Sequence, residues 1–219
     1  MSNSKLRRGF TVIEVLVYAT ILLILVGAIT LAVQGGLKYM RQGAEYQDAQ
    51  RQTLIGLKSL TSDLSRSTTA WRDPDGGTPA MTNADYMIFL SPMPNPPATD
   101  WTYSGDELQY HAWICYYLSA KPIGDLIRVR RPLAGPSTSS LITGIPTLAD
   151  FQTPQPGDES RVIARGVTEF RLNDGASGGQ VQINLTCSVN WEDTDGDGVN
   201  DRDIVTSISG QSLAVLPNS

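Results

Sequence analysis

The sequence predicts an α+β protein in which a long N-terminal helix, membrane-spanning in its first half, packs on an antiparallel β-sheet head. Three observations lead to this fold class. The stretch from Val15 to Leu37 contains no charged residue, and leucines recur at helical spacing after it. The second half of the chain alternates apolar and polar residues in segments rich in branched and aromatic side chains. With 219 residues, the chain is long enough for one ordinary domain and an appendage.

The charge-free run is long enough to cross a membrane. At about 1.5 Å per residue it extends roughly 34 Å, against a hydrocarbon core of about 30 Å. Lys5, Arg7 and Arg8 precede it without an acidic residue, so the positive-inside rule keeps the N-terminus in the cytoplasm and exports the rest. The run is longer than the apolar core of an ordinary secretory signal, and only weak cleavage sites follow it. The favourable cut lies before the run, between Gly9 and Phe10.

The N-terminal segment, KLRRGFTVIEVLVYATILLIL, resembles that of type IV pilins and type II secretion pseudopilins. In that family a short basic leader ends in Gly, Phe follows, and a Glu stands at the fifth position of the mature chain. Gly9, Phe10, Thr11 and Glu14 match this pattern. The resemblance implies cleavage after Gly9 by prepilin peptidase, commonly followed by N-methylation of Phe10. It also implies an inner-membrane assembly platform as a partner, and packing with other pilin or pseudopilin subunits through the helices in a filament core.

Glu14 has an expected role in this assembly. A charge at mid-bilayer costs at least about 2.5–3.5 kcal/mol, so an acid in such a run is a functional hypothesis by default. Cleavage creates an α-amine on Phe10 that is largely cationic at neutral pH. Pairing this amine with a Glu14 carboxylate in the helix bundle offsets much of the cost of burying either charge. The alternative interpretation is that Glu14 only complements the positive end of the helix dipole and extends to the interface.

Beyond the apolar run, the helix is expected to continue into the head. Gly35 and Gly36 interrupt the pattern and predict a looser or bent segment, because each glycine costs about 0.5–1 kcal/mol relative to alanine in a helix. A leucine stripe then predicts a face that packs under the head: Leu54, Leu57, Leu60 and Leu64. The predicted organisation is a leader over residues 1–9, a transmembrane and filament-core helix over 10–37, an amphipathic helix over 38–70 and a β-rich head over 71–219.

The head is predicted to be an antiparallel sheet. Its clearest strand is residues 181–191, VQINLTCSVNW, where apolar and polar residues alternate throughout. Further candidates are rich in aromatic and branched residues and are separated by proline-rich loops; they cover residues 84–91, 108–119, 125–133, 161–174, 203–209 and 212–216. A long helix followed by such a sheet again resembles pilin-like proteins. The mature length and the segment before the last strands resemble the larger minor pilins or the J-type minor pseudopilin.

The segment WEDTDGDGVNDRD contains a candidate calcium loop over residues 193–203. Calcium takes about 6–8 oxygen ligands, and D-x-D-x-D-G loops wrap around it. Ile204 stands where an EF-hand has its bidentate Glu, and the segment resembles the calcium loops of thrombospondin-type repeats instead. The alternative interpretation is a solvated acidic turn between two strands. The candidate ligands are Asp193, Asp195, Asp197, the Val199 carbonyl, Asp201 and Asp203.

Cys115 and Cys187 lie in the portion expected to be exported, a compartment in which a disulfide persists. A bridge between them would stabilise the fold by about 4 kcal/mol in the loop-entropy model. The alternative is two separately buried thiols. Together with His111, the single histidine, the two thiols would also make three zinc ligands, but no fourth ligand and no CxxC motif is evident. A partly exposed strand histidine is the favoured interpretation.

The resemblance implies a non-enzymatic structural subunit. From Phe10 onward, 14 basic residues face 22 acidic ones, for a net charge of −8, which argues against nucleic-acid binding. No catalytic triad and no Gly-rich phosphate loop is specified. The expected location is the bacterial inner membrane, in contact with lipid before assembly, with the head periplasmic or extracellular in a filament. One alternative is a membrane-anchored, calcium-dependent binding module or adhesin that does not polymerise. Another is a secreted enzyme, for which no active site is evident.

Overall fold

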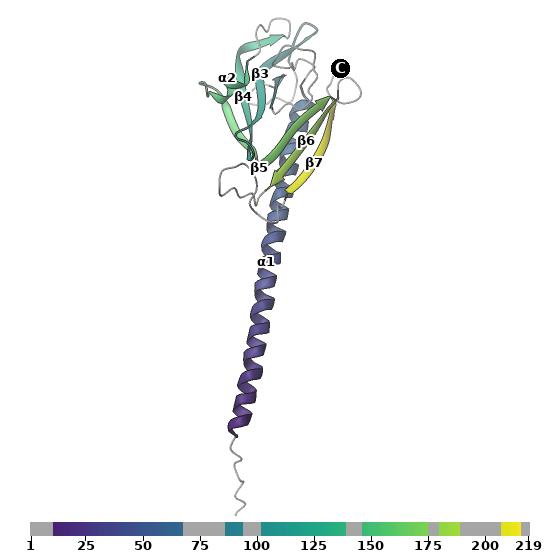
Figure 1. Ribbon diagram of the computed structural model, residues 1–219. Helices are drawn as coiled ribbons and strands as arrows, with labels where there is room; N and C mark the ends of the chain where they lie inside the picture. Colours follow the sequence, from purple (N-terminus) through teal and green to yellow (C-terminus); the bar gives the residue numbers. More distant parts are fainter. Residues whose placement is uncertain are drawn as a thin grey trace, which may run out of the picture. The chain divides into compact units, whose positions relative to one another are not determined.

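The computed structural model describes residues 11–67, 86–93, 102–138, 146–174, 180–188 and 207–215. A long helix is followed by a β-rich region that contains one short helix (Figure 1). The elements are α1 (Val12–Leu64), β1 (Tyr86–Ser91), β2 (Tyr103–Ser104), β3 (Glu107–Leu118), β4 (Gly124–Thr138), α2 (Leu148–Gln152), β5 (Glu159–Asp174), β6 (Gln180–Ser188) and β7 (Ser207–Val215). This confirms the predicted α+β fold with its long N-terminal helix.

The chain divides into two compact units between Ala44 and Glu45, so α1 contributes to both. In the first unit the helix continues through Gly35 and Gly36 without interruption, so the helix is not broken there. A Cβ atom added at either glycine would meet nothing within 4 Å. No contact within the described chain therefore requires a glycine at these two positions.

In the second unit, the C-terminal part of α1 packs on the sheet. Leu57, Leu60 and Leu64 are buried in the core, as the leucine stripe predicted. Leu54 is 59% exposed, so its assignment to the stripe was wrong. Successive spacings of three residues drift by about 60° around a helix with 3.6 residues per turn, which rotates Leu54 off the buried face. The neighbouring Thr53 lies on that face instead and is buried.

The sheet is antiparallel, with the strand order β1-β3-β4-β5-β6-β7 and with β2 paired to β3. Figure 1 shows β5, β6 and β7 side by side. Five strands match predicted segments: β1, β3, β4, β5 and β6. The two-residue strand β2 was not predicted. Strand β7 joins parts of the segments 203–209 and 212–216 into one strand; residues 203–206 and 216 lie outside the described residues.

Strand β4 continues to Thr138, beyond the predicted end at Leu133. The prediction failed because prolines usually end a central strand. Here Pro132 lies beyond Arg130, the last β4 residue paired with β5, so this end of β4 pairs only with β3. Prolines are tolerated at such an edge and at bulges, and the β3–β4 register shifts next to this position.

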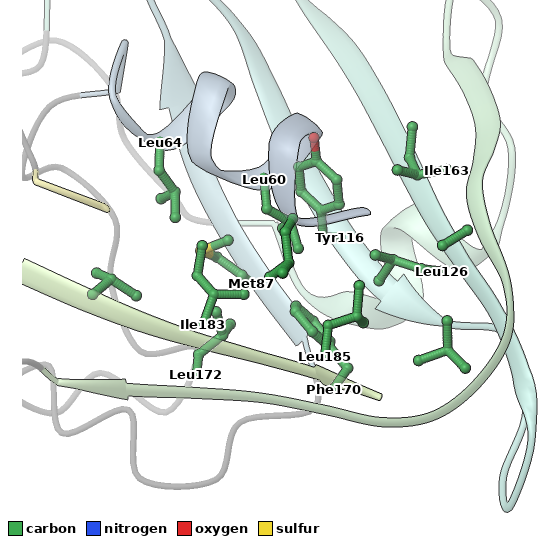
Figure 2. Packing of buried hydrophobic residues seen from close by; sticks show 14 of the residues in the cluster. Leu60, Leu64, Met87, Tyr116, Leu126, Ile163, Phe170, Leu172, Ile183 and Leu185 are labelled. Atoms are coloured by element: carbon green, nitrogen blue, oxygen red, sulfur yellow. The ribbon is translucent and has the colours of Figure 1, made fainter. Parts of the chain in front are cut away.

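Two hydrophobic clusters lie on opposite faces of the sheet. Alternate residues of β3 divide between them: Ile114 and Tyr116 belong to the cluster with the α1 leucines, whereas Trp113 and Cys115 belong to the cluster that includes Phe151 of α2. Figure 2 shows the first cluster, in which leucines of α1 point toward apolar side chains from the sheet. The head therefore has one core under α1 and a second core on the other side of β1, β3 and β4.

Two glycines permit the close approach of α1 to the sheet. A Cβ at Gly210 of β7 would lie 2.6 Å from Cδ1 of Leu57, and a Cβ at Gly56 would overlap Cδ2 of Leu185 in β6. An alanine at either position would therefore force the neighbouring leucine side chain to shift.

Polar contacts fix the helix on the same strands. Thr61 Oγ1 is 2.9 Å from Oγ of Ser212. Thr53 Oγ1 shares its proton between the Ala49 carbonyl at 2.9 Å and the Ile208 carbonyl at 3.2 Å.

Candidate functional site

The first turn of α1 is a reciprocal hydrogen-bonded cap built from Thr11 and Glu14. Glu14 Oε2 accepts from the backbone N–H of Thr11 at 2.9 Å and from the Thr11 hydroxyl at 3.0 Å. The backbone N–H of Glu14 donates in return to Thr11 Oγ1 at 3.3 Å. This is a capping box, which satisfies N–H groups that have no partner within the helix. Glu14 is therefore oriented by the helix start, and its carboxylate lies beside residue 11.

The Thr-x-x-Glu motif of Thr11 and Glu14 is a sequence signal for this cap that the prediction for Glu14 did not include. The cap uses the backbone and side chain of Thr11 only. Removal of residues 1–9 would leave those groups in place. Capping and charge pairing are therefore compatible roles for Glu14, and each can be removed separately.

After this cap, the helix surface of the first unit is apolar and exposed. One helix in the described part of the chain, α1, is long and apolar enough by length and composition to cross a membrane. Its apolar residues of the first unit expose about half or more of their surface: Val12, Ile13, Val15, Leu16, Val17, Tyr18, Ile21, Leu22, Leu23, Ile24, Leu25, Val26, Ile29, Leu31, Val33, Leu37, Tyr39 and Met40. Exposed apolar area of this extent marks a membrane or protein interaction surface.

Several predicted site residues lie outside the described residues. Gly9 and Phe10, the predicted processing positions, precede the first described residue. The six candidate calcium ligands also lie outside: Asp193, Asp195, Asp197, Val199, Asp201 and Asp203. These assignments stay predictions.

The predicted disulfide between Cys115 and Cys187 is not formed: both are free, buried thiols. Cys115 belongs to the cluster that includes Phe151, and Cys187 to the cluster under α1, so they lie on opposite faces of the sheet. Strands β3 and β6 are also separated by β4 and β5. Three strand spacings of about 4.8 Å exceed the roughly 4.4–6.8 Å between the Cα atoms of a disulfide. Burial raises the pKa of the Cys115 thiol to about 12, which leaves it protonated and unreactive.

His111 lies in β3, half-buried, as the sequence predicted for a strand histidine. Its Nε2 is 2.7 Å from the hydroxyl of Thr102. Among the described residues, no three His, Cys, Asp or Glu side chains gather where they could hold a metal ion. The imidazole lines a cavity beside the guanidinium of Arg130.

His111 is expected to titrate below its ordinary pKa of 6.5. Burial lowers the pKa most, and the positive charge of Arg130 lowers it further. Because the pKa of His111 is lower in the folded state than in the unfolded state, the neutral imidazole stabilises the fold at neutral pH. This contribution should be lost as the pH falls through the pKa of the folded state. Since the chain has one histidine, its Cε1–H resonance can be followed against pH directly. Arg130→Gln should raise the pKa partway, and a wild-type pKa at or above 6.5 would contradict the expectation.

A partly buried polar network joins the end of α1 to the sheet, and no local sequence pattern indicated it. Asp63 Oδ2 accepts from the Tyr116 hydroxyl at 2.7 Å and from Nε of Arg128 at 2.6 Å. The Tyr116 hydroxyl is also 2.9 Å from Oγ of Ser59. Burial and the Asp63 charge raise the pKa of Tyr116, so the phenol stays neutral. Burial acts to lower the pKa of Arg128, but the hydrogen bond and charge of Asp63 raise it on balance.

The comparisons with known proteins agree with the N-terminal resemblance. Residues 4–30 match the family described as the prokaryotic N-terminal methylation motif. No curated protein and no solved structure matches the chain. The match confirms the resemblance to type IV pilins and pseudopilins at the N-terminus and marks the chain as a pilin-like substrate of prepilin peptidase. The apolar helix α1, which this motif overlaps, fits a protein anchored in the inner membrane.

Proposed function

We propose that this chain is a minor structural subunit of a type IV pilus or of a type II secretion pseudopilus, assembled through its N-terminal helix. The observation that carries this proposal is the methylation motif at residues 4–30, which overlaps the exposed apolar surface of α1 from Val12 onward. The motif would be cleaved by prepilin peptidase. The apolar surface would be buried first against lipid and then against neighbouring helices. The proposed role is non-enzymatic, and it involves other pilin or pseudopilin subunits and an inner-membrane assembly platform.

The proposed topology follows from charge. Lys5, Arg7 and Arg8 stay in the cytoplasm, because translocating basic residues is disfavoured. The head then lies in the periplasm or, in a filament, outside the cell. Cleavage after Gly9 removes these basic residues and frees the amine of Phe10. In the filament core, that amine pairs with the Glu14 carboxylate of a neighbouring subunit, because each charge alone is costly in a low-dielectric bundle.

The N-terminal peptide of the protein isolated from its native host tests this proposal. Mass spectrometry should find a mature chain that starts at Phe10, with or without an N-methyl group. Processing at that position keeps the apolar helix on the mature protein, as assembly requires. A chain that begins after the apolar run, beyond about residue 28, would mean that the helix is discarded, and would overturn the proposal.

We also propose that residues 193–203 bind calcium as a structural ion in the head. The support is the alternation of aspartates with glycines in this segment. Six acidic residues lie within residues 192–203, opposed by a single arginine, Arg202. Extracellular sites of this kind bind with dissociation constants of about 10⁻⁴–10⁻³ M. The ion would stabilise the connection between β6 and β7.

The thermal unfolding of the full-length protein in detergent tests the calcium proposal. With about 10 mM calcium and a dissociation constant near 1 mM, linkage adds roughly 1.4 kcal/mol, which raises the Tm by about 3–6 °C. Asp195→Ala should remove this rise. Asp106→Ala, which removes an exposed acid from another turn, should retain it. If calcium does not raise the Tm of the unmutated protein, the calcium proposal is wrong and the segment is an ordinary acidic turn.

A second candidate is a membrane-anchored, calcium-dependent binding module that does not polymerise. One observation favours it: the capping box gives Glu14 a local role that needs no partner subunit. In that case a substitution that removes the charge of Glu14 but keeps the cap should not impair the protein. The Glu14 and Thr11 variants described in the Discussion separate the two candidates.

A further inference from the structure

A bulge between β3 and β4 opens a cavity in the head. Ala112 pairs with Pro132, and Tyr110 pairs with Ser137, so His111 alone lies opposite the four residues 133–136. A bulge bends its strand and redirects side chains, and bulges are over-represented next to functional sites. The extra residues of β4 are not paired with β3, and a cavity lies here beside His111.

The cavity has the size and walls of a small-ligand site. Its volume is about 310 Å³, at the lower end of the roughly 300–1,000 Å³ typical of such sites. Pro132, Leu133 and Pro136 supply apolar walls, and the polar lining includes His111, Arg130 and Glu159. Apolar walls with a few polar groups that converge are the usual composition of a binding site for an organic molecule.

Arg130 is the buried cation of this cavity. Its side chain is 8% exposed, whereas that of Glu159 is 51% exposed. Nη2 of Arg130 donates to the Met93 carbonyl at 3.1 Å. Nη1 is 3.8 Å from Oε1 of Glu159, too far for a hydrogen bond. Within the described part of the chain, this buried guanidinium therefore makes one hydrogen bond, although it has several further N–H donors to offer.

These observations define the ligand that would fit. A guanidinium with free donors matches a carboxylate, which accepts two parallel N–H···O bonds. A phosphate dianion fits less well, because Arg130 is the single cationic side chain among the described residues of the lining, and Glu159 lines the same cavity. We propose that the cavity binds a carboxylate carried on an apolar body, with Arg130 as its anchor. The carboxylate could belong to a small organic acid or to the C-terminus of a polypeptide.

The single histidine makes the test direct, because its imidazole resonance reports on the cavity without assignment. The full-length protein in detergent, labelled with ¹³C-histidine, would be titrated with phenylacetate and, separately, with the neutral isostere phenylacetamide. Phenylacetate should shift the His111 resonance in a saturable way, and phenylacetamide should bind at least tenfold more weakly. The peptide Ac-Gly-Pro-Leu, as free acid and as amide, forms the second arm. Tighter binding of the peptide acid than of phenylacetate assigns the site to a polypeptide terminus, and the reverse assigns it to a small acid.

Three variants locate the binding at the guanidinium. Arg130→Gln should weaken phenylacetate binding at least tenfold, and Arg130→Lys, which keeps the charge but loses the planar fork, by a smaller factor. Arg161→Gln removes an exposed positive charge from β5 outside the cavity and should leave the affinity within twofold. Tryptophan fluorescence would check that each variant is folded. If Arg130→Gln does not fold, the affinity of Arg130→Lys for phenylacetate tests the proposal instead.

Two results would overturn the proposal. One is the absence of a saturable shift of the His111 resonance with either acid. The other is binding that does not discriminate, either between acid and amide or between wild type and the folded Arg130 variants. Both would mean that the cavity is only a by-product of the bulge.

Discussion

A Glu14→Gln chain is expected to fold and to enter the membrane, yet to be incorporated into filaments on the order of 100-fold less than the wild type. Glutamine at this position can still accept the hydrogen bonds of the Thr11 cap, because capping boxes use Glu or Gln alike. What the substitution removes is the negative charge. Leaving one member of a buried ion pair without its partner costs about 3–5 kcal/mol, and the lower end of this range corresponds to such a loss in an assembly equilibrium. The measurement is the ratio of subunit in sheared filaments to subunit in the membrane fraction of the native host.

The matched control is Thr11→Val, which removes the capping hydroxyl and keeps the charge of Glu14. Loss of an N-cap costs about 1 kcal/mol of helix stability, so the first turn should loosen while incorporation stays near the wild-type level. The opposite pattern, with normal incorporation of Glu14→Gln and failure of Thr11→Val, would show that Glu14 acts through the cap. The non-polymerising candidate would then be favoured.

Much of the fold could be predicted because its signals are local. The first half of α1 is indicated by the length and apolar composition of one segment, and β6 by the alternation within one strand. The elements that were missed have weak local signals. Helix α2 spans only five residues, and its cap by Thr147 and Asp150 is too short a pattern to distinguish it from a turn. The continuation of β4 past Pro132 depends on its having lost β5 as a neighbour, which is a tertiary fact.

The candidate sites could likewise be predicted where their signal is local and could not where it depends on tertiary contacts. Glu14 was found because a charge in an apolar run is visible in sequence. The error over the disulfide has a specific origin: β3 is buried on both faces around Cys115, so no alternation shows to which face that thiol points. Asp63 meets Tyr116 and Arg128 across sequence separations of 53 and 65 residues, and no periodic pattern reports such a contact. The cavity at His111 likewise arises from a register shift between two strands.

Asp63→Ala should destabilise the head by about 3 kcal/mol, a large fraction of the roughly 5–15 kcal/mol that stabilises an ordinary domain. The substitution leaves the guanidinium of Arg128 without its counter-charge at a side-chain exposure of 12%. It also removes the acceptor of the Tyr116 hydroxyl. The measurement is urea unfolding of the full-length protein in detergent, followed by tryptophan fluorescence. Asp48→Ala, an exposed acid on the same helix, should change stability by no more than about 0.5 kcal/mol.

A double-mutant cycle decides whether the effect belongs to the ion pair. Arg128→Met removes the buried cation and keeps an apolar side chain of similar length, so the Asp63→Ala substitution made in that background no longer strands a positive charge. We therefore expect its cost to fall to about 1 kcal/mol, the value of the remaining hydrogen bond from Tyr116. An equal cost in both backgrounds would mean that Arg128 is screened by solvent and that Asp63 acts through Tyr116 alone. A reduced cost would make this pair the electrostatic link between the last turn of α1 and strands β3 and β4.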